Sequence, residues 1–302
     1  MKRGKLFRGE GAMAASSGAR SLRSGAVIGL AGLGAALAWI GAAPAGPTPA
    51  AQPGARPRRI VSLNLCADQY LLALADRDQI AGLTRNATDP DLSAAAKDAR
   101  GLRILGQSAE EILEIQPDLI IGARSRRSPV LAALPAQDYR LVDLAWATSF
   151  AQIAAQTRQI ADAVGHHGRG AALVARMERD LAGLPQPGKG RVAAYYQRRG
   201  YLTGTGTLVD DLMQRAGLVN LAGRLDKPAL SRLSLEELVA ARPDFIIVEA
   251  AAEKVSDQGT EMLQHPALRG VRRIVLPQAW TVCGGPAYVR AARSLVEQLG
   301  AS

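Results

Sequence analysis

The sequence contains few of the residues that mark a metalloprotein, a disulfide-rich protein or a nucleophilic enzyme. It has 2 cysteines, 3 histidines and 4% aromatic residues in 302 positions. Two cysteines cannot build the dense disulfide framework of a small secreted domain, so the fold must depend on packing. None of His166, His167 and His265 has a partner at zinc-ligand spacing. A phosphate-binding loop, a dinucleotide fingerprint and a nucleophile elbow are also missing from the sequence, so we expect no protein-bound cofactor, no metal site and no enzyme activity.

The net charge of +10 is concentrated near the N-terminus. Residues 1–56 hold seven basic residues and one acidic residue, which leaves a net charge of +4 on the rest of the chain. That remainder has no basic helix interleaved with aromatic residues and no known nucleic-acid-binding signature. We therefore expect no nucleic-acid partner.

The N-terminal segment has the parts of an export signal. A basic stretch ending at Arg23 precedes an apolar run, and Ala43-Pro44-Ala45 fits a small-x-small cleavage site. We predict a cleaved signal peptide over 1–45, a flexible lead-in over 46–56 and a periplasmic location. An uncleaved membrane anchor is the alternative, because the apolar run is nearly long enough to span a bilayer.

An internal repeat gives the organisation of the rest of the chain. Residues 108–121 read SAEEILEIQPDLII, and residues 234–247 read SLEELVAARPDFII. Ser108 and Ser234 each stand three residues before a glutamate, which is the spacing of a capping box at the start of a helix. The following proline ends each helix, and the apolar run after it suits a buried parallel strand.

Each half of the chain also opens with a strand and a helix. Strands are predicted at 59–63 and 190–196, and helices at 68–75 and 208–216. Each half therefore has the elements of its own α/β lobe. The predicted fold class is α/β, with two Rossmann-like lobes that have mostly parallel sheets and are joined by a long α-helix.

Helical sequence without strands separates the two halves. Ser149 can cap a helix that Gly165 ends, and a second helical pattern follows it. We assign an N-terminal lobe to 57–165, a linking helix to 166–186 and a C-terminal lobe to 187–302.

These segments, in this order, resemble a known family: the substrate-binding proteins of ABC importers for cobalamin, ferric siderophores and haem, whose lobes are joined by one long helix. The resemblance covers about residues 57–300. It implies a monomer that binds a small-molecule metal chelate between its lobes and delivers it to an ABC permease and its ATPase at the inner membrane. The stretches that carry it are Arg59 to Asn64, the two repeat units, Asn220-Leu221-Ala222 and the segment from Leu276 to Pro286.

The ligand site is expected where loops at the ends of the strands face each other across the lobes. Tyrosine and tryptophan rings there offer flat faces for a macrocycle or a catecholate. Arginines there offer paired hydrogen bonds to an anion, which favours an iron complex of siderophore type over cobalamin. The predicted ligand-binding residues are Cys66, Arg85, Arg124, Arg126, Tyr196, Arg198, Tyr201, Trp280 and Cys283.

The resemblance also implies one acidic contact per lobe that docks on arginines of the permease. By their position in the repeat, these contacts are Glu110 and Glu236. The alternative is that both are ordinary first-turn glutamates, stabilised by the helix dipole.

The two cysteines allow three interpretations. Cys66 and Cys283 could form a disulfide between the lobes, if their Cα atoms come within about 7 Å of each other. They could hold a soft metal as a thiolate pair, or be unrelated buried residues. An exported metal-handling protein, or an enzyme with a reactive thiol at Cys66 or Cys283, is therefore the alternative function. The enzyme would need a nearby base, and no histidine lies in the candidate loops.

Overall fold

The computed structural model describes residues 56–106, 108–122, 131, 139–253, 255 and 257–301. All of these residues fall within one compact unit, Pro49–Ser302. The predicted signal peptide, the lead-in up to residue 55 and the site candidates Arg124 and Arg126 lie outside the described residues.

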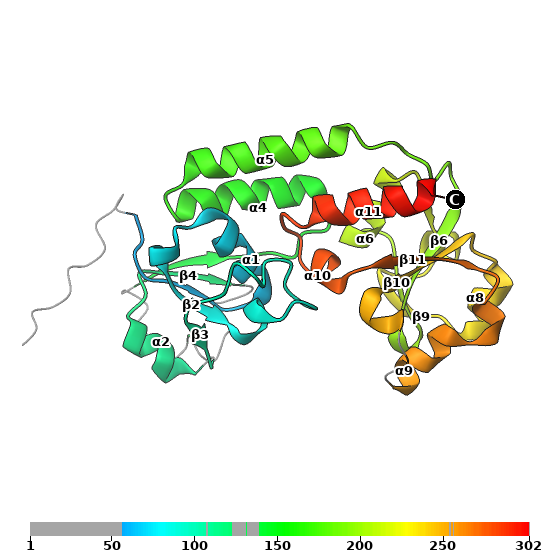
Figure 1. Ribbon diagram of the computed structural model, residues 1–302, viewed down its shortest axis with the longest axis horizontal. Coiled ribbons are helices and arrows are strands. Elements are labelled where there is room, and N and C mark those ends of the chain that lie inside the picture. The colour runs from blue at the N-terminus through cyan, green and yellow to red at the C-terminus, as the bar shows by residue number, and fades with distance from the viewer. Residues whose placement is uncertain are drawn as a thin grey trace, which may run out of the picture. The chain divides into compact units, whose positions relative to one another are not determined.

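The first sheet has five parallel strands in the order β3-β2-β1-β4-β5. Figure 1 labels its strands β2, β3 and β4. Its central strands are buried along their whole length, which is typical of a parallel sheet covered on both faces. Alternate residues serve the two faces: Ile60 packs with the core around α1, and Val61 packs with Ile112 of α2. The elements are β1 (Ile60–Ser62), α1 (Leu65–Leu74), β2 (Ile80–Thr84), β3 (Ile104–Leu105), α2 (Ala109–Ile115), β4 (Leu119–Gly122) and β5 (Arg140–Asp143).

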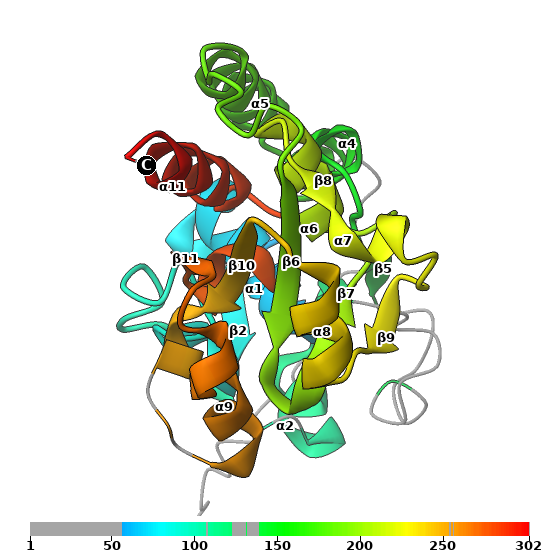
Figure 2. The ribbon, with the colours of Figure 1, turned by 90° about the vertical axis from the view of Figure 1, so that its right-hand side faces the viewer.

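The second sheet has six strands and is mixed. Figure 2 shows its strands β11, β10, β6, β7 and β9 next to one another. Strands β6, β8, β10 and β11 run parallel, and β7 is antiparallel to both of its neighbours, β6 and β9. The prediction of an α/β fold with mostly parallel sheets is therefore confirmed. The strands are β6 (Val192–Gln197), β7 (Tyr201–Thr203), β8 (Val219–Asn220), β9 (Leu230–Arg232), β10 (Phe245–Glu249) and β11 (Arg272–Leu276); the helices are α6 (Leu208–Arg215), α7 (Leu221–Arg224), α8 (Leu235–Ala241), α9 (Gln258–Glu261), α10 (Gln278–Thr281) and α11 (Tyr288–Gly300).

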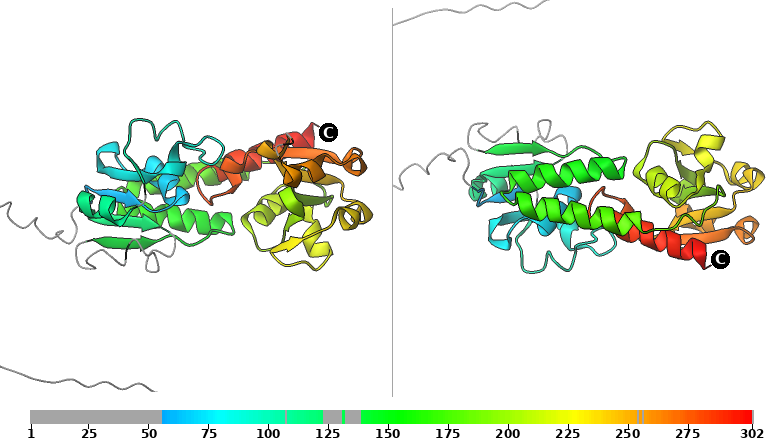
Figure 3. Two further views of the ribbon diagram at one scale, coloured as in Figure 1. Left: turned by 90° about the horizontal axis from the view of Figure 1, so that it is seen from below. Right: turned by 90° about the horizontal axis from the view of Figure 1, so that it is seen from above.

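A helical hairpin connects the two sheets. Its helices are α4 (Phe150–Ala163) and α5 (His167–Ala182), which lie side by side in Figure 3. Ser149 caps α4 as predicted, by accepting a hydrogen bond from the backbone N–H of Gln152. Gly165 ends the helix with a φ of +81°, which a glycine adopts without strain. Helix α5 leads into β6 and also contacts α11, so the helix that joins the lobes is packed between two others.

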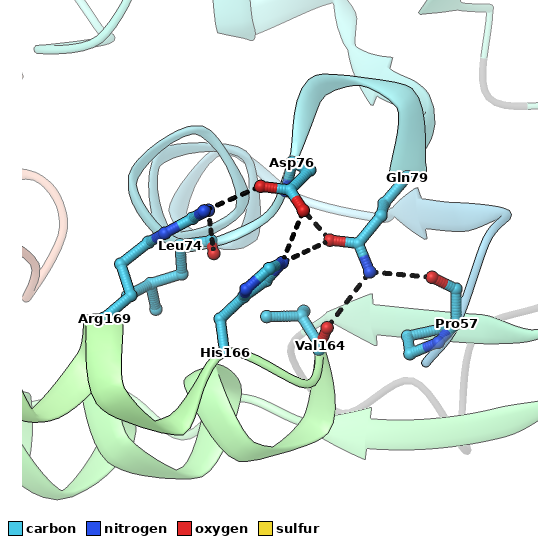
Figure 4. A network of polar contacts seen from close by, with 7 residues as sticks. All are labelled: Pro57, Leu74, Asp76, Gln79, Val164, His166 and Arg169. Carbon is cyan, nitrogen blue, oxygen red and sulfur yellow. Dashed lines mark hydrogen bonds and ion pairs between the residues drawn. The ribbon is translucent and has the colours of Figure 1, made fainter. Parts of the chain in front are cut away.

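A network of polar contacts fixes the turn of this hairpin to the end of α1 (Figure 4). His166 Nε2 lies 2.9 Å from Asp76 Oδ2 and 2.9 Å from Gln79 Oε1. Because both oxygens are hydrogen-bond acceptors, Nε2 is assigned the proton. Arg169 donates to Asp76 Oδ1 at 2.7 Å, and this bond is the main reason that the pKa of Asp76 lies below its usual value. The hairpin is thereby anchored to the first lobe.

Candidate functional site

A cavity of about 300 Å³ opens between the loop after β5 and the C-terminal ends of β6 and β10. The first lobe contributes Trp146, Ala147 and Thr148 to its wall. The rest of the wall comes from the second sheet, the start of α6 and the segment that begins with α10. Those residues are Tyr195, Gln197, Thr203, Thr207, Leu208, Val209, Glu249, Gln278, Thr281, Val282 and Gly284.

The wall combines apolar surface with neutral polar groups and one carboxylate, that of Glu249. The Tyr195 hydroxyl lies 3.3 Å from Thr281 Oγ1, and the side-chain amide of Gln197 donates to Glu249 Oε1 at 3.4 Å. Burial raises the pKa of Glu249, and the charge of Arg198 with the hydrogen bond from Gln197 opposes that rise. The pKa of Tyr195 is also raised, by burial and then by the charge of Glu249. Among the described residues that line the cavity there is no arginine, lysine or histidine.

Trp146 is an aromatic residue of the cavity wall that was not among the predicted contacts. Its side chain lines the cavity and is 68% exposed, in the loop between β5 and α4. An exposed indole ring beside a cavity offers a large flat surface for a ligand to cover. The available signal was its place in the loop after a strand of the first lobe, where binding residues of α/β folds gather.

Tyr195, not the predicted Tyr196, faces the cavity. Tyr196 is fully buried in the core beneath α8, and its hydroxyl donates to the Leu233 carbonyl at 2.8 Å. Burial raises the pKa of Tyr196 to about 12. Successive side chains of a strand point to opposite faces of the sheet, so only one of the two adjacent tyrosines can reach the cavity. Tyr196, a predicted ligand contact, therefore does not line this cavity.

Cys66 and Cys283 form a disulfide, with their Cα atoms 5.3 Å apart. This selects the first of the three interpretations and leaves neither thiol free for a metal or for catalysis. Cys66 lies in the first turn of α1, and Cys283 lies between α10 and α11. Val282 and Gly284, the sequence neighbours of Cys283, line the cavity, so the disulfide lies directly behind the cavity wall.

Two of the predicted residues in the second lobe are bound to other parts of that lobe. Arg198 forms an ion pair with Asp257, the residue that caps α9. The guanidinium of Arg232 lies 5.2 Å from the centre of the Tyr201 ring. Neither Arg198 nor Tyr201 lines the cavity.

The other two predicted contacts also lie outside the cavity wall. Arg85 is exposed at the end of β2. Trp280 is half-buried against the core, with the guanidinium of Arg290 6.0 Å from its ring centre. None of the seven described residues of the predicted set therefore lines this cavity; they are Cys66, Arg85, Tyr196, Arg198, Tyr201, Trp280 and Cys283.

The sequence profile described as "Periplasmic binding protein" matches residues 60–272. This chain belongs to the periplasmic binding protein family. A cobalamin-binding protein of Halobacterium salinarum is 24% identical over 207 residues, which are 67% of this chain and 56% of that protein. The chain therefore spans a little more than half the length of that relative.

Solved structures of this family share the fold and differ in the ligand named for them. The periplasmic heme-binding protein RhuT of Roseiflexus sp. RS-1 is 26% identical, with a TM-score of 0.64 over 80% of this chain and 97% of its own. The vitamin B12-binding protein BtuF of Vibrio cholerae is 17% identical, with a TM-score of 0.60 over 82% and 98%. An Fe3+-hydroxamate transport protein of Saccharomonospora viridis is 20% identical, with a TM-score of 0.60 over 81% and 94%. The fold alone therefore does not select one ligand for this family member.

The predicted docking glutamates occupy equivalent positions in this binding protein. Glu110 and Glu236 are exposed in the first turns of α2 and α8, whose N-caps are Ser108 and Ser234. Hydrogen bonds in the first turn of α2 lower the pKa of Glu110. The largest effect comes from the backbone N–H of Glu110 itself, and the Ser108 side chain contributes next. Both carboxylates therefore face solvent, one on each lobe.

Within the part of the chain that the structure describes, no helix combines the length and the hydrophobicity needed to cross a bilayer. The same residues contain no group of three or more histidine, cysteine, aspartate or glutamate side chains placed to hold a metal ion.

Proposed function

We propose that this protein is exported to the periplasm, captures a cobalamin-type corrinoid in the cavity beside Trp146 and delivers it to an ABC permease and its ATPase. The observation that carries the proposal is an exposed indole at the edge of a cavity whose described wall combines apolar surface with neutral polar groups and has no basic side chain. A corrinoid is a large, nearly flat ring with amide side chains around its rim.

The wall offers complementary groups to such a ring. Trp146 can cover an apolar face of the macrocycle, which gains from the burial of aromatic surface. The side chains of Gln197, Gln278 and Thr203 both donate and accept hydrogen bonds, as the amides of a corrinoid do. The similarity to a cobalamin-binding protein of Halobacterium salinarum supports the same ligand class.

The arginines of the candidate loops had favoured an anionic iron complex as the ligand. Arg85 and Arg198 do not line the described cavity, which removes part of that argument. Haem is the second candidate, because RhuT is 26% identical to this chain. We rank haem below a corrinoid, since the described wall holds no histidine and its tyrosine is 1% exposed.

The proposed mechanism is binding and delivery, with no chemical step and no resident cofactor. The signal peptide over 1–45 directs export, and a monomer binds one ligand. The loaded protein then docks through Glu110 and Glu236, one contact on each lobe. ATP hydrolysis in the partner ATPase drives release into the permease.

Calorimetric titration of the purified exported protein with cyanocobalamin, haem and a ferric hydroxamate tests the ligand. We expect one-to-one binding of cyanocobalamin, weakened about tenfold or more by Trp146→Ala, because a well-packed aromatic contact typically contributes 1–2 kcal/mol or more. Leu230→Ala is the matched control, since Leu230 is 60% exposed and does not line the cavity. Tighter binding of haem or of the hydroxamate than of cyanocobalamin would refute the proposal.

A further inference from the structure

Glu249 is the only carboxylate among the described residues that line the cavity. It is the last residue of β10, at the C-terminal end of the parallel part of the second sheet. Its side chain is partly buried and accepts a hydrogen bond from Gln197 of the neighbouring strand at 3.4 Å. It is therefore placed at the end of the sheet where ligands of α/β folds bind.

The charges around Glu249 do not neutralise it fully. Arg198 is the cation close enough to influence its pKa, and that guanidinium is already paired with Asp257. Tyr195 on β6 also interacts with Glu249, but a tyrosine hydroxyl is neutral at physiological pH, and burial raises its pKa further. The described cavity wall thus presents one carboxylate with no basic partner within the wall.

We infer that Glu249 determines the ligand specificity of this cavity. Its carboxylate accepts hydrogen bonds from amide N–H groups on the ligand rim, and it repels ligands that place a carboxylate beside it. The inference rests on the proposed function and makes it more specific, because it names the class of side chain that the ligand must present.

The physical reason is the difference between two groups of nearly equal size. A carboxamide can donate an N–H to the Glu249 carboxylate, and hydrogen bonds to a charged acceptor are stronger than neutral ones. A carboxylate in the same place has no proton to donate and repels the charge of Glu249 in a partly desolvated site. A binding site that combines such an attraction with such a repulsion gains specificity from both.

The inference predicts discrimination between cyanocobalamin and its monocarboxylic acids, in which one rim amide is hydrolysed and the shape is retained. For at least one of these isomers, we expect the wild-type protein to bind the acid about tenfold or more weakly at neutral pH, since the acid leaves two carboxylates facing each other in a partly buried site. Glu249→Gln should bring the two affinities within about threefold of each other, because the repelling charge is gone.

Glu253→Gln is the matched control, because it removes the same charge from an exposed residue outside the cavity wall. It should keep the wild-type discrimination. A second readout is pH: discrimination by the wild type should shrink as Glu249 becomes protonated, while Glu249→Gln should show no such loss. Thermal melting of each variant checks that the fold is retained.

The possible failures can be told apart. If the wild type binds cyanocobalamin and binds every monocarboxylic acid equally tightly, the inference is wrong and the proposed function stands. The same conclusion follows if Glu249→Gln discriminates between amide and acid as the wild type does. An equal loss of affinity for amide and acid in Glu249→Gln also overturns it, because that is the result of a structural role. Tighter binding of haem than of cyanocobalamin would overturn both the inference and the proposed function, since haem brings two carboxylates into the cavity.

Discussion

The disulfide between Cys66 and Cys283 joins two segments that are 217 positions apart in the sequence. It ties the first turn of α1, in the first lobe, to the segment between α10 and α11, which follows the last strand of the second sheet. The Tyr70 hydroxyl of α1 reinforces this tie by donating to the Gly284 carbonyl at 2.7 Å. The segment that completes the cavity wall is therefore held by the first lobe.

Removal of the disulfide should destabilise the protein and loosen this wall. We expect the double variant Cys66→Ser/Cys283→Ser to lose about 3 kcal/mol of unfolding free energy, because a disulfide that closes a long loop restricts the unfolded chain. Ligand affinity should fall as well, since Val282 and Gly284 line the cavity. Urea denaturation and titration with and without reductant measure both effects. Reductant should affect the wild type and leave the double variant unchanged, and the same response in both would contradict the prediction.

Two adjacent glycines after Cys283 offer a matched pair of substitutions. A Cβ added at Gly284 would clash with the Cβ of Ala147, whereas a Cβ at Gly285 meets nothing within 4 Å. Gly284→Ala should therefore force the segment away from the first lobe and cost about 1–3 kcal/mol of unfolding free energy, as overpacking does. Gly285→Ala should leave the stability within about 0.5 kcal/mol of the wild type, the usual range for a substitution that disturbs no packing. Equal denaturation midpoints for the two variants would show that this contact does not constrain the segment.

The pKa of Asp76 makes the anchor of the hairpin dependent on pH. It is lowered first by the hydrogen bond from Arg169 and also by the charges of His166 and Arg56. A group with a lowered pKa stabilises the fold above its unfolded-state pKa, near 3.8, and loses that contribution as the pH falls through the lower, folded-state value. Asp76→Asn should thus be less stable than the wild type at neutral pH, with the difference closing below pH 3.8.

Denaturation across this pH range, with Asp78→Asn as the control, tests the anchor. Asp78 is an exposed aspartate two residues further along, outside the network of Figure 4. A difference between wild type and Asp76→Asn that persists unchanged at low pH would mean that the charge of Asp76 is not what stabilises the turn.

Local rules predicted most of the fold, and long-range packing determined most of the site. The caps at Ser108, Ser149 and Ser234 are contacts between near neighbours, so sequence patterns predict them. Sequence patterns do not reveal which of Tyr195 and Tyr196 faces the cavity. Strand β6 is buried on both faces from Val192 to Tyr196 and shows no polar alternation that would reveal which face is the cavity.

The positions of other candidate residues depend on partners that are distant in the sequence. Arg198, a predicted ligand contact, forms an ion pair with Asp257 from another loop, and no local pattern predicts that pair. Cys66 and Cys283 left three alternatives because only the folded chain brings their Cα atoms within bonding range. Trp146 was missed because a single loop tryptophan has no periodic pattern around it.

Permease docking is tested by reversing the charge of Glu110 and Glu236. These side chains are exposed in the first turns of α2 and α8, outside the cavity wall, so the double variant to lysine should keep its ligand affinity within a few fold. Uptake in cells should be abolished, because each new lysine would face an arginine of the permease. Glu114→Lys combined with Glu253→Lys is the charge-matched control, since both glutamates are exposed, one in each lobe, and neither is a predicted contact. Equal loss of uptake in the control would assign the effect to net charge, and a collapse of ligand affinity in the docking variant would show that the two glutamates support the fold.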